Sequence, residues 1–288
     1  MNGILLIDKP SCITSRDVVN QVSKKLDIKK VGHTGTLDPI ATGVLVLCVG
    51  EATKAVELLT AMDKEYIAEV MLGVETDTLD ITGKVLNEEK VDLEKNTIIN
   101  VLNSFKGRYY QEVPIYSAVK VKGKKLYEYA RNGENIELPK RLVSINSIEL
   151  IDDLYLVDNH LCFKFKCSVS KGTYIRSLIK DICDCLNIKG TMLNLRRIKQ
   201  GKFSIDNCIN INEVDCSKLL SLVDVLDIPK IEVNEFLKHK IINGQILENR
   251  YESDKVMFTY NGDLLAIYQA YSKDNSKIKP YKMFGGIK

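Results

Sequence analysis

One loop of this sequence gathers side chains that could do chemistry. Residues 31–43 read VGHTGTLDPIATG and place a histidine, several threonines and one carboxylate, Asp38, between two apolar segments. A carboxylate so placed can act as a nucleophile or stabilise a developing positive charge. The loop has no lysine and no G-x-x-x-x-G-K-[ST] pattern, so it is not a phosphate loop of that type. Asp38–Pro39 could also begin an ordinary bend, and these residues alone leave both interpretations open.

Seven collinear segments resemble the TruB family of pseudouridine synthases, bacterial enzymes that make pseudouridine 55 in the T-arm of transfer RNA. One of these segments, GHTGTLDPIATGVL, contains the loop. The others are GILLIDKPSCITS, DKEYIAEVMLG, GVETDTLDITG, IYSAVKVKGKKLYEYARNG, SKGTYIRSLIKDI and LNLRRIKQGKF, and together they span most of residues 3–203. Two positions depart from the family pattern: Cys12 stands where Gly is usual, and Val113 where a Pro-Pro pair is usual.

The resemblance implies roles for five residues. Asp38 would be the catalytic carboxylate, and Arg176 would pair with it, because a buried carboxylate resists ionisation without a nearby cation. Tyr66 would stack on the flipped base and take the proton from C5. Tyr174 and Leu195 would line the pocket, with Leu195 as an apolar wall.

Three more residues are expected to help bind the substrate. His33 would fill the space left by the extruded nucleotide, since extrusion costs a few kcal/mol. Lys9, in the first motif, and Asp80, in the acidic loop, are expected to contribute as well. Without the resemblance, Tyr66 would be an ordinary core aromatic of a strand, Arg176 a solvated residue on a first helical turn, and His33 a surface residue.

The reaction that the resemblance implies needs few components. Pseudouridine forms when the N1–C1′ bond breaks, the base turns, and C5 joins C1′, without redox change or loss of atoms. The sequence therefore predicts no cofactor, and its three scattered histidines and the spacing of its cysteines indicate no metal site. A carboxylate near C1′ is required. Whether it attacks C1′ or the base, or whether a glycal forms, is left open.

RNA would have to bind through local clusters, because the net charge is only +3. Charge runs are usually solvated faces, but three clusters flanking the candidate site favour a groove that follows RNA phosphates and loses affinity steeply with salt. The clusters are Lys120, Lys122, Lys124, Lys125 and Arg131, interleaved with Tyr116, Tyr127 and Tyr129; Lys164 with Lys166; and Arg196, Arg197, Lys199 and Lys202.

The loop must be held by the elements around it. Strands are expected at Gly3–Ile7, Val44–Val49, Glu65–Gly73 and 161–169. Apolar residues at helical spacing predict helices through Val18 to Leu26, Ala52 to Met62, Ile98 to Phe105, and Ile175 to Leu186. Strands and helices are interspersed without regular βαβ alternation, which favours a mixed sheet. The resemblance implies an α/β (α+β) pseudouridine synthase fold, with a large, mainly antiparallel mixed sheet, flanking helices and a cleft across the sheet.

The sequence changes character near residue 229. After Ile228–Pro229 come short segments with turn signals, and FTYNGDLLAIYQ predicts a hairpin because Asn-Gly favours a type I′ turn. We predict a catalytic domain at 1–228 and a small, mostly β domain at 229–288 that resembles the PUA-type RNA-binding appendage.

Composition sets the remaining expectations. The chain has 288 residues, 45% apolar and 27% charged, as in ordinary globular proteins. The N-terminus lacks a basic region and has only four consecutive apolar residues, Ile4–Ile7, which predicts no signal peptide and a cytoplasmic protein with reduced cysteines.

The expected function is that of an isomerase, a transfer RNA pseudouridine-55 synthase acting on the T-arm stem-loop. We expect a monomer with no membrane contact and no obligatory protein partner, unlike the guide-RNA-dependent relatives. One alternative is an RNA-binding or RNA-folding module without catalysis, which would not need Asp38, Arg176 and Tyr66 together. A carboxylate hydrolase of nucleosides is less favoured, because it would not explain the basic clusters or the extra domain.

Overall fold

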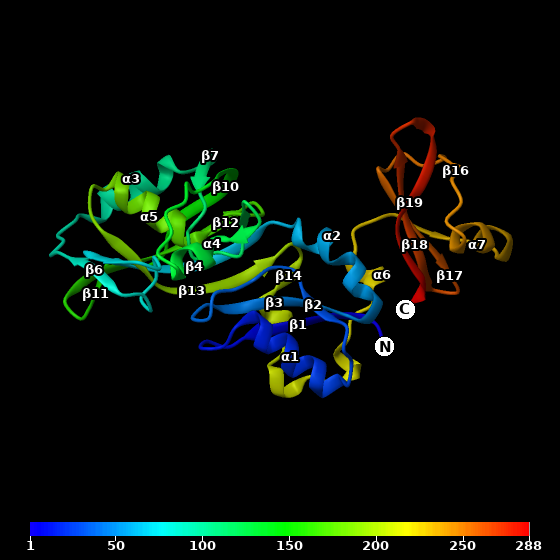
Figure 1. Cartoon of the computed structure of the whole chain (residues 1–288), viewed down its shortest axis with the longest axis horizontal. Coiled ribbons are helices and arrows are strands. Elements are labelled where there is room, and N and C mark those ends of the chain that lie inside the picture. Colours follow the sequence, from blue (N-terminus) through cyan, green and yellow to red (C-terminus); the bar gives the residue numbers. More distant parts are fainter. Residues whose placement is uncertain (288) are drawn as a thin grey trace.

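The chain builds two separate main sheets (Figure 1). The structure, a computed structural model, describes residues 1–287. The larger sheet has ten strands, in the order β1-β3-β13-β4-β12-β10-β7 with three short strands attached. Its strands are β1 (Gly3–Lys9), β2 (Val31–His33), β3 (Thr42–Val49), β4 (Lys64–Leu72), β7 (Gly107–Glu112), β10 (Lys140–Leu150), β11 (Tyr155–Val157), β12 (His160–Val169), β13 (Gly190–Gln200) and β14 (Phe203–Ser204).

All pairs in this sheet are antiparallel except β13 with β3, which run parallel over two residue pairs. The predicted mixed, mainly antiparallel sheet is confirmed. Two short hairpins lie outside it, β5 (Val74–Thr76) with β6 (Val85–Glu88), and β8 (Lys120–Val121) with β9 (Lys124–Lys125).

The helices are α1 (Ser15–Leu26), α2 (Val56–Thr60), α3 (Lys95–Ser104), α4 (Leu126–Arg131), α5 (Ile175–Cys185), α6 (Leu222–Val225) and α7 (Glu235–Ile242). Helix α1 begins where a local signal predicts it: the Thr14 hydroxyl accepts from Asp17 N–H, and the Asp17 carboxylate accepts from Thr14 N–H. The second predicted helix is shorter than expected. Residues Gly50–Ala55 form a 3₁₀ segment, and only one turn of α-helix follows before the chain enters β4.

One predicted loop is too long, and two long strands of the large sheet have no counterpart among the predicted strands. The loop predicted over residues 31–43 is shorter, because β2 takes its first residues and β3 begins at Thr42. Periodicity did not predict β10 or β13. Both strands contain bulges, between Ile145 and Ser147 in β10 and at two points in β13, and each bulge shifts the inward-facing positions by one.

The two halves of the large sheet have different covers. Helices α3 and α5 pack on β4, β12 and β10 around Phe163, Phe165 and Leu178. Helix α1 covers one face of β1 and β3. On the other face of β1 and β3, the 3₁₀ segment and residues of the small sheet join one apolar cluster with Ile4 and Val46.

The small sheet has the order β15-β17-β18-β19-β16. Its strands are β15 (Lys230–Glu232), β16 (Leu247–Glu248), β17 (Lys255–Tyr260), β18 (Asp263–Tyr271) and β19 (Asp274–Ile287). The turn between β17 and β18 has Asn261 at φ 51° and Gly262 at φ 79°, as a type I′ turn requires. Because this sheet shares an apolar cluster with the large one, its independence as a domain stays a prediction.

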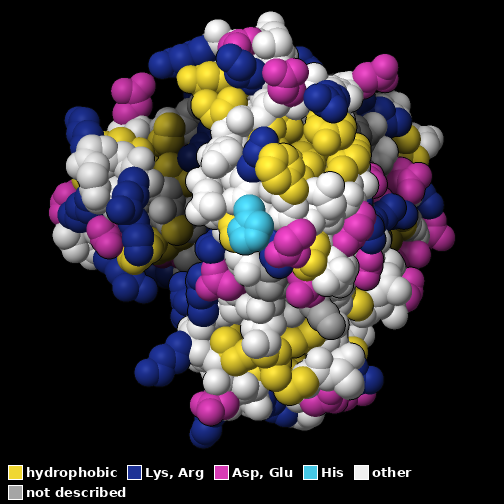
Figure 2. Space-filling model, turned by 90° about the vertical axis from the view of Figure 1, so that its right-hand side faces the viewer, with side chains coloured by type: hydrophobic (Ala, Val, Ile, Leu, Met, Phe, Trp, Pro, Cys, Tyr) yellow, Lys and Arg dark blue, Asp and Glu magenta, His cyan; other side chains and the backbone are white. Residues whose placement is uncertain are grey.

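Figure 2 faces the side of the molecule that carries the small sheet. Lysine and arginine side chains are scattered there among acidic ones, in keeping with the small net charge of +3. Apolar patches interrupt them, and Phe236 on α7 is 70% exposed. Within residues 1–287, no helix is long and apolar enough to cross a membrane.

Candidate active site

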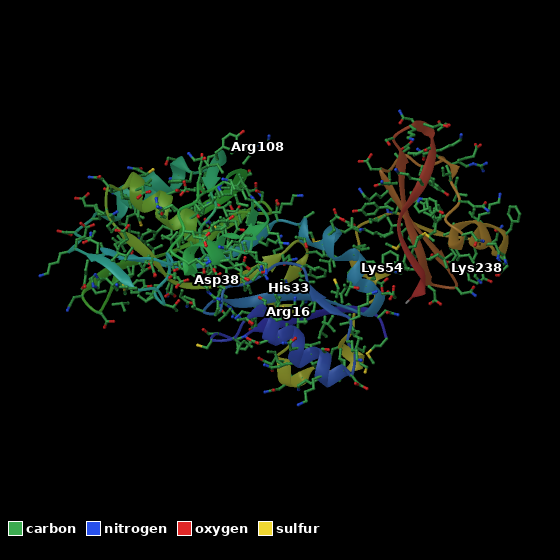
Figure 3. The ribbon with its side chains drawn as sticks, in the orientation of Figure 1. Arg16, His33, Asp38, Lys54, Arg108 and Lys238 are labelled. Atoms are coloured by element: carbon green, nitrogen blue, oxygen red, sulfur yellow. The ribbon has the colours of Figure 1, made fainter. Side chains whose placement is uncertain are left out.

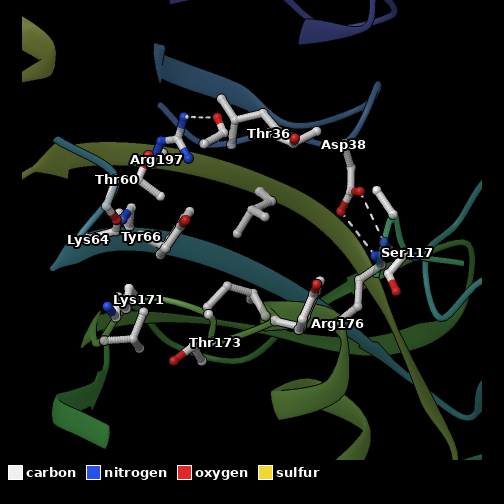
Figure 4. Close-up of a pocket in the computed structure, with 18 of the residues that line it drawn as sticks. Thr36, Asp38, Thr60, Lys64, Tyr66, Ser117, Lys171, Thr173, Arg176 and Arg197 are labelled. Atoms are coloured by element: carbon white, nitrogen blue, oxygen red, sulfur yellow. Dashed lines mark hydrogen bonds and ion pairs between the residues drawn. The ribbon is translucent and has the colours of Figure 1, made fainter. Parts of the chain in front are cut away.

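Asp38 and Arg176 form a bidentate ion pair. Asp38 lies in the loop between β2 and β3, and Arg176 is the second residue of α5, 138 positions later. Arg176 Nε donates to Asp38 Oδ2 and Arg176 Nη2 to Asp38 Oδ1, both at 3.0 Å (Figure 4). The arginine side chain is 7% exposed and the aspartate 29% exposed. Bidentate pairs of this kind fix orientation as well as charge.

The rest of the guanidinium is held by two other loops. Arg176 Nη1 donates to the Thr78 carbonyl at 2.9 Å, and Nη2 also donates to the Tyr116 carbonyl at 3.0 Å. The Asp80 carboxylate lies 4.0 Å from Nη1. Three chain segments therefore fix the arginine, and the arginine fixes the Asp38 carboxylate with its charge compensated.

A cavity of about 360 Å³ opens beside this pair. Tyr66 reaches it from β4, Leu195 from the neighbouring strand β13, and Tyr174 from the residue that precedes α5. The structure thus brings together Asp38, Arg176 and these three, all of which line the cavity. The volume lies in the range of small-molecule sites, enough for one nucleoside.

Three predicted substrate-binding residues do not line the cavity. Asp80 is 5% exposed, and its Oδ1 accepts from the Thr82 N–H and from the hydroxyls of Thr78 and Thr82. It shapes the loop that offers the Thr78 carbonyl to Arg176. Lys9 is fully buried and donates to the carbonyls of Pro10, Ile13 and Pro39 at 2.7 to 3.1 Å. Both residues hold loops, and direct contact with a substrate is not supported by their positions.

His33, the third of these residues, lies at the end of β2 near Arg16 (Figure 3). Its Nδ1 is buried and has no hydrogen-bond partner among residues 1–287. Burial lowers the pKa of His33, and Arg16 and Arg197 lower it further, so the imidazole is neutral at pH 7.

Lys9 ties the first motif to the catalytic loop. The Lys9 ammonium donates to the carbonyl of Pro39, the residue that follows Asp38. Burial lowers the pKa of Lys9 to about 8, and the charge of Asp38 offsets part of that effect. Two further hydrogen bonds join the same two segments. Cys12 N–H donates to the Pro39 carbonyl at 2.9 Å, and the Ser11 hydroxyl donates to the Ile40 carbonyl at 3.0 Å.

The two departures from the family pattern have different consequences. Val113 is buried, and its N–H donates to the Pro139 carbonyl at 3.0 Å, a bond that a proline could not make. Cys12 has a φ of 67°, in the left-handed region that disfavours any side chain with a Cβ. The cysteine therefore strains a turn in which the usual glycine would be relaxed.

Replacing Cys12 by glycine is expected to stabilise the protein by about 0.5–1 kcal/mol, because relief of the left-handed strain exceeds the added entropy of the unfolded chain. Urea unfolding followed by circular dichroism measures the change. Cys12→Ala is the matched control: it removes the thiol but keeps the Cβ, and should gain nothing. Equal gains in both variants would assign the effect to the thiol instead.

Gln111 is a buried positioning residue that sequence reasoning missed. Its Oε1 accepts from Tyr174 N–H at 2.8 Å, and its Nε2 donates to the Tyr109 hydroxyl at 2.7 Å. The Tyr109 hydroxyl donates in turn to Asp181, and burial raises the pKa of that carboxyl to about 6. The network fixes the start of α5, just before Arg176. One signal existed: Tyr109, Gln111 and Val113 occupy every second position of the sequence, which predicts a shared strand face, and a lone polar residue on an otherwise apolar face is unusual.

The basic clusters are less available than the sequence indicated. Arg197 is 1% exposed, lines the cavity, and donates to the carbonyls of Val44 and Gly35. Arg196 makes a bidentate pair with Asp8. Lys164 and Lys166 pair with glutamates of β4 across the sheet at 3.3 and 3.7 Å. The prediction of a cationic surface is corrected at these four residues: Arg197 is buried, and a nearby acid pairs with each of the other three. Lys120 and Lys122 do remain exposed.

Within residues 1–287, no three His, Cys, Asp or Glu side chains are grouped so as to hold a metal ion. Of the described residues that line the cavity, Asp38 is the one acid.

The sequence of this chain is similar to those of known proteins. The profile described as TruB family pseudouridylate synthase (N terminal domain) matches residues 23–175. A protein of Bacillus subtilis named tRNA pseudouridine synthase B is 40% identical over 301 residues, covering 98% of this chain and 97% of the relative. The protein of the same name from Caldanaerobacter subterraneus is 42% identical and covers 99% of both chains.

Solved structures show the same fold. A structure of an H/ACA RNP bound to a substrate RNA containing 2′-deoxyuridine matches with a TM-score of 0.71 at 23% identity, over 98% of this chain and 84% of the other. A Cbf5-Nop10-Gar1 complex matches with a TM-score of 0.69 at 23% identity, over 99% and 84%. Because the profile covers more than half of the chain and full-length relatives share about two residues in five with it, this chain belongs to the TruB family of pseudouridylate synthases.

Proposed function

We propose that this chain isomerises uridine 55 in the T-arm of transfer RNA to pseudouridine. The observation that carries the proposal is the bidentate Asp38–Arg176 pair on the wall of a cavity large enough for one nucleoside. The relatives with 40% and 42% identity are named tRNA pseudouridine synthase B, which supports transfer RNA as the substrate.

In this proposal the target uridine leaves its stack and enters the cavity, because a stacked base cannot be reached. Tyr66 and Leu195 supply its flat and apolar walls. Asp38 meets C1′ as the N1–C1′ bond breaks, and acts as nucleophile or stabilises the positive charge there. Arg176 keeps the carboxylate ionised and aimed.

The balance of protons completes the step. After the base turns, C5 bonds to C1′, the proton on C5 leaves, and N1 gains one. We assign transfer of the C5 proton to the Tyr66 hydroxyl, which gives up its own proton as it accepts the one from C5, so that the tyrosine ends the step neutral. No redox partner is needed, since the product has the same atoms as the substrate.

Tyr66→Phe is expected to keep RNA affinity within about twofold and to slow isomerisation by about 10²–10⁴-fold, the usual contribution of a positioned acid or base. The ring, and hence stacking, is retained while the hydroxyl is lost. Single-turnover rates and Kd values on the same RNA separate the two effects. Tyr110→Phe is the matched control, because Tyr110 is 71% exposed on β7 and does not line the cavity. An unchanged rate for Tyr66→Phe would remove the hydroxyl from the chemistry.

The decisive experiment is tritium release. The purified chain, without added metal or cofactor, is incubated with a T-arm stem-loop carrying tritium at C5 of its uridines, and the nucleosides are then analysed. Release of tritium together with pseudouridine at the target position supports the isomerase. Binding without release would leave the alternative of an RNA-binding module without catalysis.

The partner and location belong to the same proposal. We propose that the protein works as a monomer in the cytoplasm, where transfer RNA is modified, without an obligatory protein partner. The solved complexes with partner proteins share its fold at only 23% identity.

A further inference from the structure

The cavity that holds Asp38 has an unbalanced charge. Four cations line it, and Asp38 is the one carboxylate among its lining residues. Asp38 is already paired with Arg176. The other three cations, Lys64, Lys171 and Arg197, lie toward the end of the cavity away from that pair (Figure 4).

Two of these three cations are buried, and both keep unused donors. Arg197 is 1% exposed; its Nε and Nη2 donate to backbone carbonyls, while Nη1 has no hydrogen-bond partner among the residues described. Nη1 lies 3.5 Å from the position that a Cβ on Gly35, another lining residue, would take. Lys64 is 6% exposed and donates to the Thr60 and Met62 carbonyls at 2.8 and 2.6 Å, which leaves its third N–H free.

No carboxylate of the described residues lies within ion-pair distance, 4.0 Å, of these three charges. Asp63, the acid nearest in sequence to Lys64, accepts a hydrogen bond from Asn146 at 2.8 Å. Burial lowers the pKa of Lys64 to about 8. Repulsion from Arg197 and Lys171 adds to this effect, while the charge of Asp63 offsets part of it. Buried like charges without a counter-charge are costly, and groups whose pKa is perturbed by burial and by a neighbouring charge are enriched at functional sites.

An RNA substrate can supply the missing counter-charge. Uracil is neutral and cannot balance three cations, but every nucleotide that enters the cavity brings a backbone phosphate with it. Arginine and lysine are the side chains that best bind phosphate oxygens. Thr36 lines the same cavity, and its hydroxyl adds a neutral donor.

We propose that Lys64, Lys171 and Arg197 form a phosphate subsite that binds one of the two backbone phosphates flanking the target uridine while Asp38 meets its C1′. This inference rests on the proposed function, since it takes the RNA substrate from there. The subsite would fix how far the flipped nucleotide enters the cavity. The three cations would bind its phosphate at one end of the cavity, and the Asp38–Arg176 pair would meet its C1′ at the other.

The test is a double-mutant cycle between lysine and phosphate, in the Asp38→Asn background so that turnover does not interfere. Lys171 is exposed at the rim and makes no hydrogen bond or ion pair within the described residues, so Lys171→Met should fold. Lys64→Met probes the buried cation, and Lys29→Met, an exposed lysine outside the cavity, is the matched control. Each protein is titrated with a T-arm stem-loop whose phosphate 5′ or 3′ of the target uridine is a neutral methylphosphonate.

The expected result is a loss of about fivefold or more in affinity for Lys171→Met and Lys64→Met on native RNA. The slope of the logarithm of the binding constant against the logarithm of salt concentration should also be smaller in magnitude, by about 0.7 for each phosphate that the protein no longer neutralises. One of the two methylphosphonate RNAs should bind the parent protein more weakly by a similar factor. On that RNA, neither lysine variant should lose any further affinity. With the other methylphosphonate, the loss of affinity should simply add to the loss caused by each lysine change. Lys29→Met should show no coupling to either methylphosphonate.

Additive losses with both methylphosphonates, or unchanged affinity in both lysine variants, would overturn the subsite. Should Lys64→Met fail to fold, the Lys171→Met cycle decides alone. The outcome is separate from that of the isomerase proposal: coupling without tritium release by the wild type leaves the subsite standing, and release without coupling removes only the subsite.

Discussion

Asp38→Asn is expected to lower the rate of pseudouridine formation by more than about 10⁴-fold and to change RNA affinity less than threefold. Loss of a group that bonds to or stabilises the reacting carbon removes most of the acceleration of the chemical step. Asparagine has nearly the same shape and can still accept one hydrogen bond from Arg176, so the loop should keep its place. Tritium release and nucleoside analysis give the rate, and fluorescence anisotropy gives the Kd.

Asp27→Asn is the matched control for this variant. Asp27 ends helix α1, is exposed, and has a φ of 50°, a conformation that asparagine also accepts. It should retain full activity and stability. Activity of Asp38→Asn within tenfold of the wild type would show that the carboxylate is not the group acting at C1′. Mass spectrometry checks that the variant has not deamidated back to aspartate.

Arg176→Met should damage both stability and chemistry. The change removes the partner of the Asp38 carboxylate and leaves the carbonyls of Thr78 and Tyr116 without their donor. Breaking a buried pair by removing one partner costs about 3–5 kcal/mol, and the misaligned carboxylate should lower the isomerisation rate by at least about 10³-fold. Urea unfolding and single-turnover tritium release measure the two effects separately.

Two further variants separate charge from geometry at this position. Arg176→Lys keeps the positive charge but cannot donate side-on to both carboxylate oxygens, so it should recover part of the stability while the rate stays about 10²-fold low. Lys180→Met, on the same helix, removes an exposed pair with Asp184 and should cost less than about 1 kcal/mol. Full activity of Arg176→Lys would mean that charge alone suffices.

Local features of the fold could be predicted from sequence because their causes lie within a few residues. The capping box of Thr14 and Asp17 sets the start of α1. The Asn261–Gly262 pair sets the β17–β18 turn. The alternation of β12 and the 3.6-residue period of α5 are likewise local, since one buried face suffices to impose them. The family, and with it the candidate carboxylate, also came from the sequence, through its collinear motifs.

What only the tertiary structure decided depends on residues that are distant in the chain. Asp38 and Arg176 are 138 positions apart, and their bidentate geometry follows from how α5 packs beside the β2–β3 loop. Arg197 was predicted as surface and lies buried against Val44 and Gly35, because bulges in β13 reset which residues face inward. A register shift of one residue exchanges the faces of a strand, and long-range packing, which no local pattern encodes, decides where the shift occurs.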